Sequence, residues 1–577
     1  MIMNPVRRFF RLLQLDKKDI SYIYIYAIFG GLISLTLPLG IQAIIGLIAG
    51  GAISSSWILL TAVVTFGTLM VGVLKIMQLT VSEVIQQRIF ARSAFDFAFR
   101  IPRIEIEALY KEYAPELVNR FFDTLTVQKG LPKILLDFST SILQIIFGLI
   151  LISFYHPFFI FFGVFLILLV VLIIRLTGPR GLATSLMESK YKYEVASWLE
   201  EIARTQGTFK LAGSSPLPVS KTDKLVSKYL SFRRKHFRVL LLQFGSIVGF
   251  KTLITGGLLV LGGILVIDNS INLGQFVAAE IVVILITNSV EKLILTMETI
   301  YDVLTGLEKI GSFTDLKLEK EEGIKFDEIV QPGGLNIKMI DVSYQFVDAD
   351  KPTIKDLSLE IKGGQKVCIA GFNRSGKTTL MHLMTGLFHN YTGSLLVNDT
   401  PLGSLDLNSL RERIGDFMPQ EDIFKGTLFE NITLGKKNLS LKDAMNAAEK
   451  VGLLSYIQKL PLGLNTPLVP GGKNLPRSVV TKIILARSIC TRPAMLAIKE
   501  PFSNMEPQEA ERLATLLTSS EITCTLVGIS NDPVFAKKCD RVLIMEDGKI
   551  IADGDFETIT SNPAFRPIFR KEITEAA

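Results

Sequence analysis

Charged side chains are missing from two long stretches of this sequence. Residues 20–74 make a run of 55 residues without Asp, Glu, Lys or Arg, and residues 138–174 make a second run of 37. A helix that crosses a membrane needs about 20 apolar residues, so each run can hold two spans. Two shorter runs, at about 239–267 and 271–290, carry one charge each. A buried helix of a soluble domain explains one such run, but four in one chain indicate a membrane protein.

The apolar runs divide into six helices before residue 310. Gly50-Gly51 interrupts the first run, His156-Pro157 interrupts the second, and Asp268–Ser270 separates the third from the fourth. We expect helices at about 20–48, 57–80, 134–155, 158–178, 239–267 and 271–300. The composition agrees with this, because 49% apolar residues and a mean hydropathy of +0.39 are high for a soluble chain.

The charges of the loops predict how the chain is inserted. The turns after the first, third and fifth spans carry no Lys or Arg, whereas the other two loops are long and basic. Residues 175–238 alone hold 13 Lys and Arg against 5 Asp and Glu. Basic loops stay in the cytoplasm, so we place the N-terminus, both long loops and the C-terminal half there. The prediction is a multi-pass protein of the cytoplasmic (inner) membrane. All four cysteines lie in the C-terminal half, where a reducing compartment suits them.

Composition also divides the chain into domains. Residues 1–310 are expected to form an all-α six-helix transmembrane domain whose helices extend into the cytoplasm and account for the long loops. Residues 311–335 are polar and end near a Pro-Gly-Gly turn, so they are interpreted as a linker. Residues 336–577 then form a soluble domain.

A phosphate-binding motif lies in the C-terminal half, where residues 365–380 read QKVCIAGFNRSGKTTL. A short apolar strand runs into the pattern GxxxxGK[ST], and a helix is expected to follow, which is the context this motif requires. Its glycines let backbone N–H groups surround phosphate oxygens, and the helix N-terminus adds a partial positive charge. We expect Lys377 to reach the β- and γ-phosphates and the Thr378 hydroxyl to face Mg²⁺. The nucleotide-binding set is Gly371, Asn373, Ser375, Gly376, Lys377, Thr378 and Thr379.

A six-span chain that ends in a P-loop domain resembles the exporter-type ABC transporters, in which a membrane domain is fused to an ATP-binding domain and two such chains form a dimer. Further segments carry the resemblance: Leu273–Ala278, Val342–Phe346, Leu410–Gln420, Gly426–Ile432 and Glu546–Lys549. The resemblance implies an all-α six-helix transmembrane domain plus an α/β P-loop NTPase domain of ABC type. It also implies ATP and Mg²⁺ as cofactors, adenine stacking on Phe346, and contact of Gln420 with the metal or the attacking water.

The signature segment departs from this family. The family's LSGGQ falls on Leu475–Val479, which reads LPRSV here. In the family, the signature serine and the glycine N–H groups hold the γ-phosphate of the ATP bound by the partner subunit. Pro476 offers neither a hydroxyl nor an N–H, and Arg477 and Ser478 replace the two glycines. Proline is tolerated in a first helical turn, so the helix is expected to form while its phosphate contact is lost.

Two catalytic positions also depart from the family. The strand that precedes the family's Asp-Glu pair falls on Met495–Ile498 and is followed by Lys499 and Glu500. In the family the aspartate orients Mg²⁺ and the glutamate polarises the attacking water, so Glu500 keeps its role and Lys499 reverses a charge beside the metal. The position of the switch histidine falls on Asn531. We expect a domain that binds ATP and hydrolyses it weakly or not at all.

Two hypotheses account for Lys499. In the first, its ammonium points at the β- and γ-phosphates and partly replaces Mg²⁺, so that the metal is weakly held or dispensable. In the second, Lys499 pairs with Glu500 or with another carboxylate. The sequence leaves both open.

The resemblance makes this chain a subunit of a dimeric exporter, paired with itself or with a different half-transporter. In either pairing both ATP sites are weakened, because each combines one subunit's P-loop with the other's signature. The alternative is a non-transporting, nucleotide-gated membrane scaffold or regulator. The expected partners are a second half-transporter, membrane lipid and an unknown exported substrate, with no nucleic acid. A net charge of +7 is small for 577 residues and by itself says little about nucleic acid.

Ionisable residues in or beside the apolar runs are candidates for a substrate pathway, because such groups are costly in lipid. Lys75, Asp137 and Lys251 are expected near helix ends or interfaces. Glu280 lies deeper in the sixth span and is the best candidate for a pathway or proton-coupled group.

Overall fold

The computed structural model describes residues 4–49, 55–110, 114–330, 333–418, 423–503 and 505–569. The chain divides into two compact units. The first comprises Met1–Ile104 and Ala108–Lys317, and the second comprises Glu105–Glu107 and Leu318–Ala577.

The first unit is built from helices: α1 (Pro5–Leu15), α2 (Lys17–Ser34), α3 (Thr36–Ala49), α4 (Ser55–Arg100), α5 (Ala114–Asn119), α6 (Asp123–Ser153), α7 (Phe158–Arg204), α8 (Gln206–Leu211), α9 (Leu217–Ile267) and α10 (Leu273–Thr314). Among the described residues, six helical stretches are long and apolar enough to cross a membrane, with α2 and α3 together making one of them. The predicted six-helix, all-α transmembrane domain is therefore confirmed.

A proline divides the first membrane stretch. The sequence predicts one helix at about 20–48, whereas the structure ends α2 at Ser34 and starts α3 at Thr36. Pro38 has no N–H to donate to the carbonyl of Ser34, and its ring crowds that carbonyl. The break therefore falls where a proline in α3 removes the hydrogen bond that would continue α2.

Three of the membrane helices are much longer than a bilayer requires. Helices α4, α7 and α9 contain 46, 47 and 51 residues. At 1.5 Å per residue they are about 70 to 75 Å long, against about 30 Å for the hydrocarbon core. Much of the two segments expected to be long cytoplasmic loops is therefore helical and continues the membrane helices.

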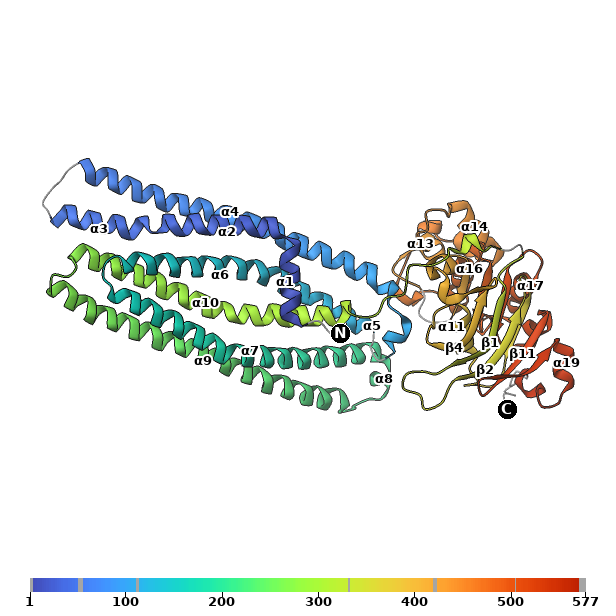
Figure 1. The fold of residues 1–577 in the computed structure, drawn as a ribbon. Coiled ribbons are helices and arrows are strands. Elements are labelled where there is room, and N and C mark those ends of the chain that lie inside the picture. Colours follow the sequence, from blue (N-terminus) through green and yellow to red (C-terminus); the bar gives the residue numbers. More distant parts are fainter. Residues whose placement is uncertain are drawn as a thin grey trace. The chain divides into compact units, whose positions relative to one another are not determined.

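Helix α10 forms the core of the first unit. It runs beside α6, while α7 runs beside α9 and α2 beside α4 (Figure 1). Val282 and Ile286 of α10 are fully buried in a cluster with residues of α6, α7 and α9. Two glycines of α6 permit this approach: a Cβ at Gly130 would lie 2.3 Å from Val303, and one at Gly148 would lie 2.9 Å from Ile286.

Two neighbouring charges on α10 pair with other membrane helices. Lys251 of α9 donates to Glu291, and Lys292 pairs with Asp137 of α6 at 2.8 Å. Lys251 and Asp137 both lie inside long helices, and each has an oppositely charged partner on α10. Pairing of this kind lowers the cost of a charge in lipid.

The second unit is an α/β domain. Its strands are β1 (Ile337–Tyr344), β2 (Ile354–Ile361), β3 (Lys366–Ala370), β4 (Tyr391–Val397), β5 (Thr400–Pro401), β6 (Ile414–Phe417), β7 (Gly426–Thr427), β8 (Pro467–Leu468), β9 (Met495–Lys499), β10 (Thr525–Ile529), β11 (Arg541–Glu546) and β12 (Lys549–Gly554). The central sheet has the order β12-β11-β3-β10-β9-β6, and β11, β3, β10, β9 and β6 run parallel. A second sheet has the order β2-β1-β4-β5. The predicted α/β P-loop domain is confirmed.

The helices of the second unit are α11 (Lys377–Met384), α12 (Leu407–Arg411), α13 (Leu428–Thr433), α14 (Leu441–Lys450), α15 (Leu454–Ile457), α16 (Arg477–Cys490), α17 (Pro507–Thr518), α18 (Pro533–Lys538) and α19 (Phe556–Ser561). Successive residues of a strand point to opposite faces of a sheet. Along β9, Met495 and Ala497 belong to the core cluster that contains the side chains of α11. Leu496 and Ile498 belong to the cluster that contains α16.

Candidate functional site

The P-loop occupies the carboxyl end of β3, at the centre of the six-stranded sheet. Gly371 and Gly376 have φ angles of +147° and +99°, which a side chain would strain. A Cβ at Gly371 would also lie 2.3 Å from the carbonyl oxygen of Met545. Glycine is therefore required at both ends of the loop, and α11 begins directly after Gly376. A loop of this form at a helix N-terminus fits a phosphate chain.

Lys377 folds back over the loop. Its Nζ donates to the carbonyl oxygens of Gly371 and Phe372, both at 2.7 Å, and to Ser375 Oγ at 3.2 Å. Ser375 and Thr379 are buried, Thr378 is half-buried and Asn373 is exposed. The predicted phosphate-binding residues thus lie on one continuous loop and helix start.

The amide of Asn531 spans the first glycine of the P-loop. Asn531 Oδ1 accepts from the Gly371 N–H at 3.1 Å, and Asn531 Nδ2 donates to the Gly371 carbonyl oxygen at 3.2 Å. Sequence analysis identified Asn531 only as a replacement for the family's switch histidine. The structure adds that the side chain holds the P-loop backbone at two points.

Lys499 and Glu500 follow each other at the carboxyl end of β9. Lys499 pairs in register with Ile529, whose carbonyl oxygen accepts the Glu500 N–H at 2.8 Å. Glu500 has a φ of +46°, a left-handed conformation that is uncommon for a residue with a side chain. The backbone of Asn531 lies near its carboxylate and favours the ionised form, which lowers the pKa.

Burial and mutual charge shift the pKa values of this group. Burial raises the pKa of Glu500, and the charge of Lys377 opposes that rise. Burial lowers the pKa of Lys377; Glu500 opposes this shift and Lys499 adds to it. Burial also lowers the pKa of His382 on α11, and the charge of Lys499 lowers it further. The side chains of Lys377, His382, Lys499 and Glu500 therefore act on a shared electrostatic environment.

His382 is the member of this group that sequence analysis missed. Thr378 and His382 are four residues apart on α11 and so lie on the same side of the helix. The spacing of four residues from Thr378 was the feature of the sequence that could have placed His382 near the site. The side chain of Lys499, by contrast, makes no ion pair or hydrogen bond with any other residue in the part of the chain that the structure describes.

The aromatic side of the site gathers around Phe346. Its ring lies 5.1 Å from that of Tyr344 and 5.8 Å from that of Phe388, in both cases edge to face. Phe346 itself is half-buried at the rim of the core cluster below α11. The half-buried ring of Phe346 is suited to stacking on a base.

Pro476 caps the helix that carries the signature segment. It is the N-cap of α16, with no side-chain hydrogen bond to the helix, and Arg477 is the exposed first residue. The helix forms although the hydroxyl cap is missing, because proline has a φ angle compatible with a helix start.

The described residues fit a nucleotide better than they fit Mg²⁺. Thr378 offers a hydroxyl at the start of α11, but the strand end that would carry an acidic metal ligand carries Lys499 instead. Gln420, the second predicted metal contact, lies outside the described residues. No group of three or more His, Cys, Asp or Glu that could hold a metal ion occurs among the residues described.

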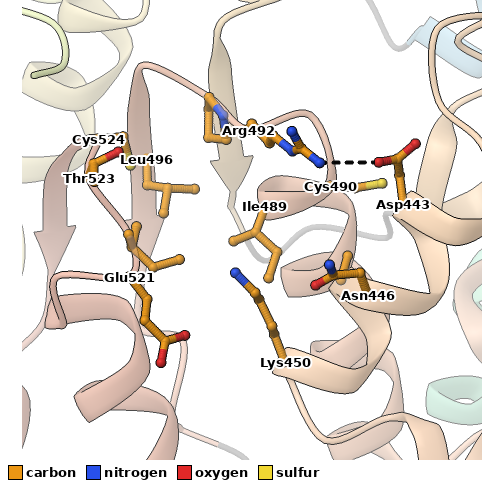
Figure 2. Close-up of a pocket in the computed structure, with 13 residues that line it drawn as sticks. Asp443, Asn446, Lys450, Ile489, Cys490, Arg492, Leu496, Glu521, Thr523 and Cys524 are labelled. Atoms are coloured by element: carbon orange, nitrogen blue, oxygen red, sulfur yellow. Dashed lines mark hydrogen bonds and ion pairs between the residues drawn. The ribbon is translucent and has the colours of Figure 1, made fainter. Parts of the chain in front are cut away.

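A separate pocket of about 310 Å³ lies on the second unit (Figure 2). Its walls include Asp443, Lys450, Arg492 and Glu521, together with the thiols of Cys490 and Cys524. It lies near the amino ends of β9 and β10, whereas the P-loop and Lys499 lie at the carboxyl ends. Burial raises the pKa of both thiols to about 11, so they are neutral near pH 7. This pocket is not part of the nucleotide site.

Comparisons with known proteins agree with the fold of both units. The profile of the ABC transporter transmembrane region matches residues 20–290, and that of the ABC transporter family matches residues 354–503. A bacterial Atm1-family ABC exporter, solved with ATP bound, superposes with a TM-score of 0.85 over 97% of this chain and 99% of that one, at 15% identity. At that identity the match shows the fold.

Three curated relatives have similar sequences. The uncharacterized ABC transporter ATP-binding protein YfiB of Bacillus subtilis is 30% identical over 44% of this chain and 44% of its own length. The transport/processing ATP-binding protein ComA of Streptococcus pneumoniae is 24% identical over 78% and 62%. The ATP-dependent lipid A-core flippase of Methylobacillus flagellatus is 23% identical over 66% and 64%. This chain thus spans about half to two thirds of the length of these relatives.

Proposed function

Because the chain belongs to the ABC transporters, with the transmembrane region and the ATP-binding domain of the exporter type in one polypeptide, we propose that it is one half of a dimeric exporter with impaired ATP hydrolysis. The protein is a multi-pass membrane protein with its nucleotide-binding domain on the cytoplasmic side. In the proposed function, the P-loop binds ATP through Gly371, Lys377 and Thr378. Phe346 stacks on the adenine.

The observation that carries the proposal is the pairing of an intact P-loop with altered strand ends. Lys377 and the glycines form a phosphate cradle, but β9 ends in Lys499 where a metal-orienting aspartate would stand. Asn531 is tied to Gly371 by both atoms of its amide. A neutral amide engaged in this way is a poor replacement for a histidine that exchanges protons and hydrogen bonds during hydrolysis. Glu500 remains as the group that would polarise water.

The signature segment supports the same proposal for the partner's site. Pro476 has no N–H or hydroxyl to offer at the start of α16, and the exposed Arg477 covers backbone that a phosphate would need to approach. In a dimer, each bound ATP would therefore contact either this altered signature or the P-loop of this chain with Lys499 and Asn531 beside it. One of the relatives is named as a lipid A-core flippase, which makes a lipophilic compound one candidate for the transported substrate.

An ATPase assay on the purified full-length protein in lipid tests the proposal. With Mg²⁺ and ATP we expect turnover at least about 100-fold below the kcat of about 10 s⁻¹ that is common for enzymes. The matched control is Lys377→Ala, which removes the P-loop amine and reports any contaminating ATPase. Turnover near 10 s⁻¹ that disappears in the control would contradict impaired hydrolysis.

The alternative, a nucleotide-gated scaffold that transports nothing, is favoured by the changes at three catalytic positions. Cysteine cross-linking across the outward turns would separate the two functions. One pair would use Asp268 or Asn269 after α9, and another would use the Gly50-Gly51 turn, which lies outside the described residues. The four native cysteines are buried and so interfere little. Cross-linking that changes with nucleotide supports transport, and an unchanging distance supports a scaffold.

A further inference from the structure

Building on the proposed ATP binding, we propose that the preferred ligand of this P-loop is the metal-free nucleoside triphosphate, with the ammonium of Lys499 in place of a magnesium ion. The proposal concerns which form of the nucleotide binds, and it holds whether or not the bound nucleotide is hydrolysed.

The pleat of β9 directs Lys499 toward α11. Met495 and Ala497 pack in the core cluster that includes Leu380 and Met381 of α11. Because side chains alternate along a strand, Lys499 lies on the same face as Met495 and Ala497. Helix α11 begins at Lys377, directly after the P-loop, so Lys499 ends its strand on the side where a bound phosphate chain would lie.

The ammonium of Lys499 is available to a ligand. No ion pair joins it to Glu500 or to another carboxylate in the described part of the chain, which disfavours the hypothesis of a purely internal pair. Lys499 is half-exposed at the strand end, so solvent and a ligand can reach part of its side chain.

Two neighbouring groups respond to the charge of Lys499. It adds to the effect of burial in lowering the pKa of Lys377, and it does the same for His382. Both residues belong to α11. The site therefore holds two lysine ammoniums, those of Lys377 and Lys499, beside the Glu500 carboxylate, whose pKa is also raised by the charge of Asp532. The two ammoniums are the groups that can bind phosphate.

This charge favours the free triphosphate over its magnesium complex. Mg²⁺ needs several oxygen ligands in near-octahedral geometry, and here a cation occupies the place of its usual carboxylate. Lysine binds phosphate as a point charge and needs no metal between them. Bound Mg²⁺ would remove two negative charges from the nucleotide and would be repelled by Lys499.

Calorimetric titration of ATP into the full-length protein in lipid nanodiscs tests the proposal without an activity assay. One titration contains EDTA and the other contains excess Mg²⁺. We expect ATP to bind in EDTA at least as tightly as in Mg²⁺. In Lys499→Asp the preference should reverse, with EDTA weakening binding by about tenfold or more, because the aspartate restores an acidic metal ligand.

Two further variants make the test specific. Lys499→Gln keeps an unbranched polar side chain, shorter than lysine and without its charge, and should weaken binding in EDTA by about tenfold. Lys459→Asp reverses an exposed lysine elsewhere on the second unit and should leave both titrations unchanged. The comparison of EDTA with Mg²⁺ in the unaltered protein remains decisive even if a variant misfolds.

The possible failures are distinct. If ATP binds in Mg²⁺ but not in EDTA, the proposed role of Lys499 is overturned and ATP binding stands. If ATP binds in neither titration, the proposed ATP binding is overturned, and this inference with it. If the unaltered protein and Lys499→Gln bind ATP with the same affinity in EDTA, the role of Lys499 is also overturned.

Discussion

At the scale of single residues, several side chains of this site differ in chemistry from the residues that the family has at the same positions. Asn531 uses both ends of its amide on Gly371, so it acts as a brace for the P-loop. Lys499 brings a positive charge to a strand end that faces α11. Glu500 keeps the acidic group that follows β9, where burial raises its pKa.

Removing the brace should loosen the P-loop. In Asn531→Ala the two hydrogen bonds to Gly371 are lost, and we expect the loop to open more easily by about 1 to 2 kcal/mol. Hydrogen exchange of the peptides that cover residues 371–376, measured in the full chain, checks this. Exchange equal to that of the unaltered protein would show that the amide does not restrain the loop.

A second cluster in the same unit gives a prediction for pH. Burial favours a higher pKa for Glu319, but the nearby His389 ring, whose Nε2 lies 3.7 Å from Oε1, and the hydrogen-bonded guanidinium of Arg411 outweigh it and hold the pKa below its usual value. A carboxylate with a lowered folded pKa stabilises the fold above its unfolded pKa, and the contribution is lost as the pH falls through the folded value. Arg411 Nη2 donates to Glu319 at 3.0 Å, and only 7% of the Glu319 side chain is exposed.

We therefore expect Glu319→Gln to destabilise the region around Arg411 by about 1 to 3 kcal/mol at neutral pH. The difference from the unaltered protein should begin to shrink as the pH falls below the unfolded pKa of about 4.3, and it should vanish only below the lower folded pKa, where the carboxyl is protonated in both states. Hydrogen exchange of the full chain at several pH values measures it. A difference that is constant with pH would rule out an ionic contribution.

At the scale of elements, α10 organises the first unit. Its buried side contacts α6 through Gly130 and Gly148, and its Glu291 and Lys292 pair with α9 and α6. The close approach of α6 depends on the absence of side chains at these glycines. A helix pair of this kind is held by van der Waals packing, because lipid provides no hydrophobic force between helices.

Enlarging Gly130 should separate α6 from α10. A Cβ there would lie 2.3 Å from Val303, so Gly130→Leu is expected to cost about 1 to 3 kcal/mol through overpacking. Gly72→Leu on α4 is the matched control, because nothing lies within 4 Å of a Cβ at Gly72. The thermal unfolding midpoints of the two full-length variants in the same detergent give the comparison. Equal midpoints would show that the contact at Gly130 is not tight.

At the scale of the whole molecule, the proposed dimer couples two kinds of defect. Lys499 and Asn531 alter the chain's own nucleotide site, whereas Pro476 and Arg477 alter the site of the subunit that faces it. The two defects therefore lie in different segments of the chain. In a homodimer, each ATP site contains both of them.

Hydrolysis should recover only when both defects are repaired. We expect neither the pair Lys499→Asp and Asn531→His nor the triple change Pro476→Ser, Arg477→Gly and Ser478→Gly to raise turnover strongly in a homodimer. All five changes together should raise it by roughly 100-fold or more, because preorganised transition-state contacts carry effects of this size. ATPase assays of the three variants in lipid, with Mg²⁺, measure it. Full recovery from either set alone would contradict the combined-site account.

Much of this protein could be predicted from local patterns. The charge-free runs require membrane helices, since a bilayer excludes charge over a fixed thickness. The glycines and Lys377 of the P-loop follow one another along the chain, so their common site could be recognised without a fold. The break between α2 and α3 coincides with Pro38, but α6 and α7 continue through Pro132 and Pro179, so a proline by itself does not predict where a membrane helix ends.

Other features depend on contacts between distant parts of the chain, and only the tertiary structure decided them. Asn531 meets Gly371 across 160 residues because β10 lies next to β3 in the sheet. Lys499 faces α11 because of the pleat of β9 and the layer that covers it. Sequence by itself determined which side chains stand at the strand ends. Sheet order and helix packing determined which of them meet, because such contacts join segments that no local pattern links.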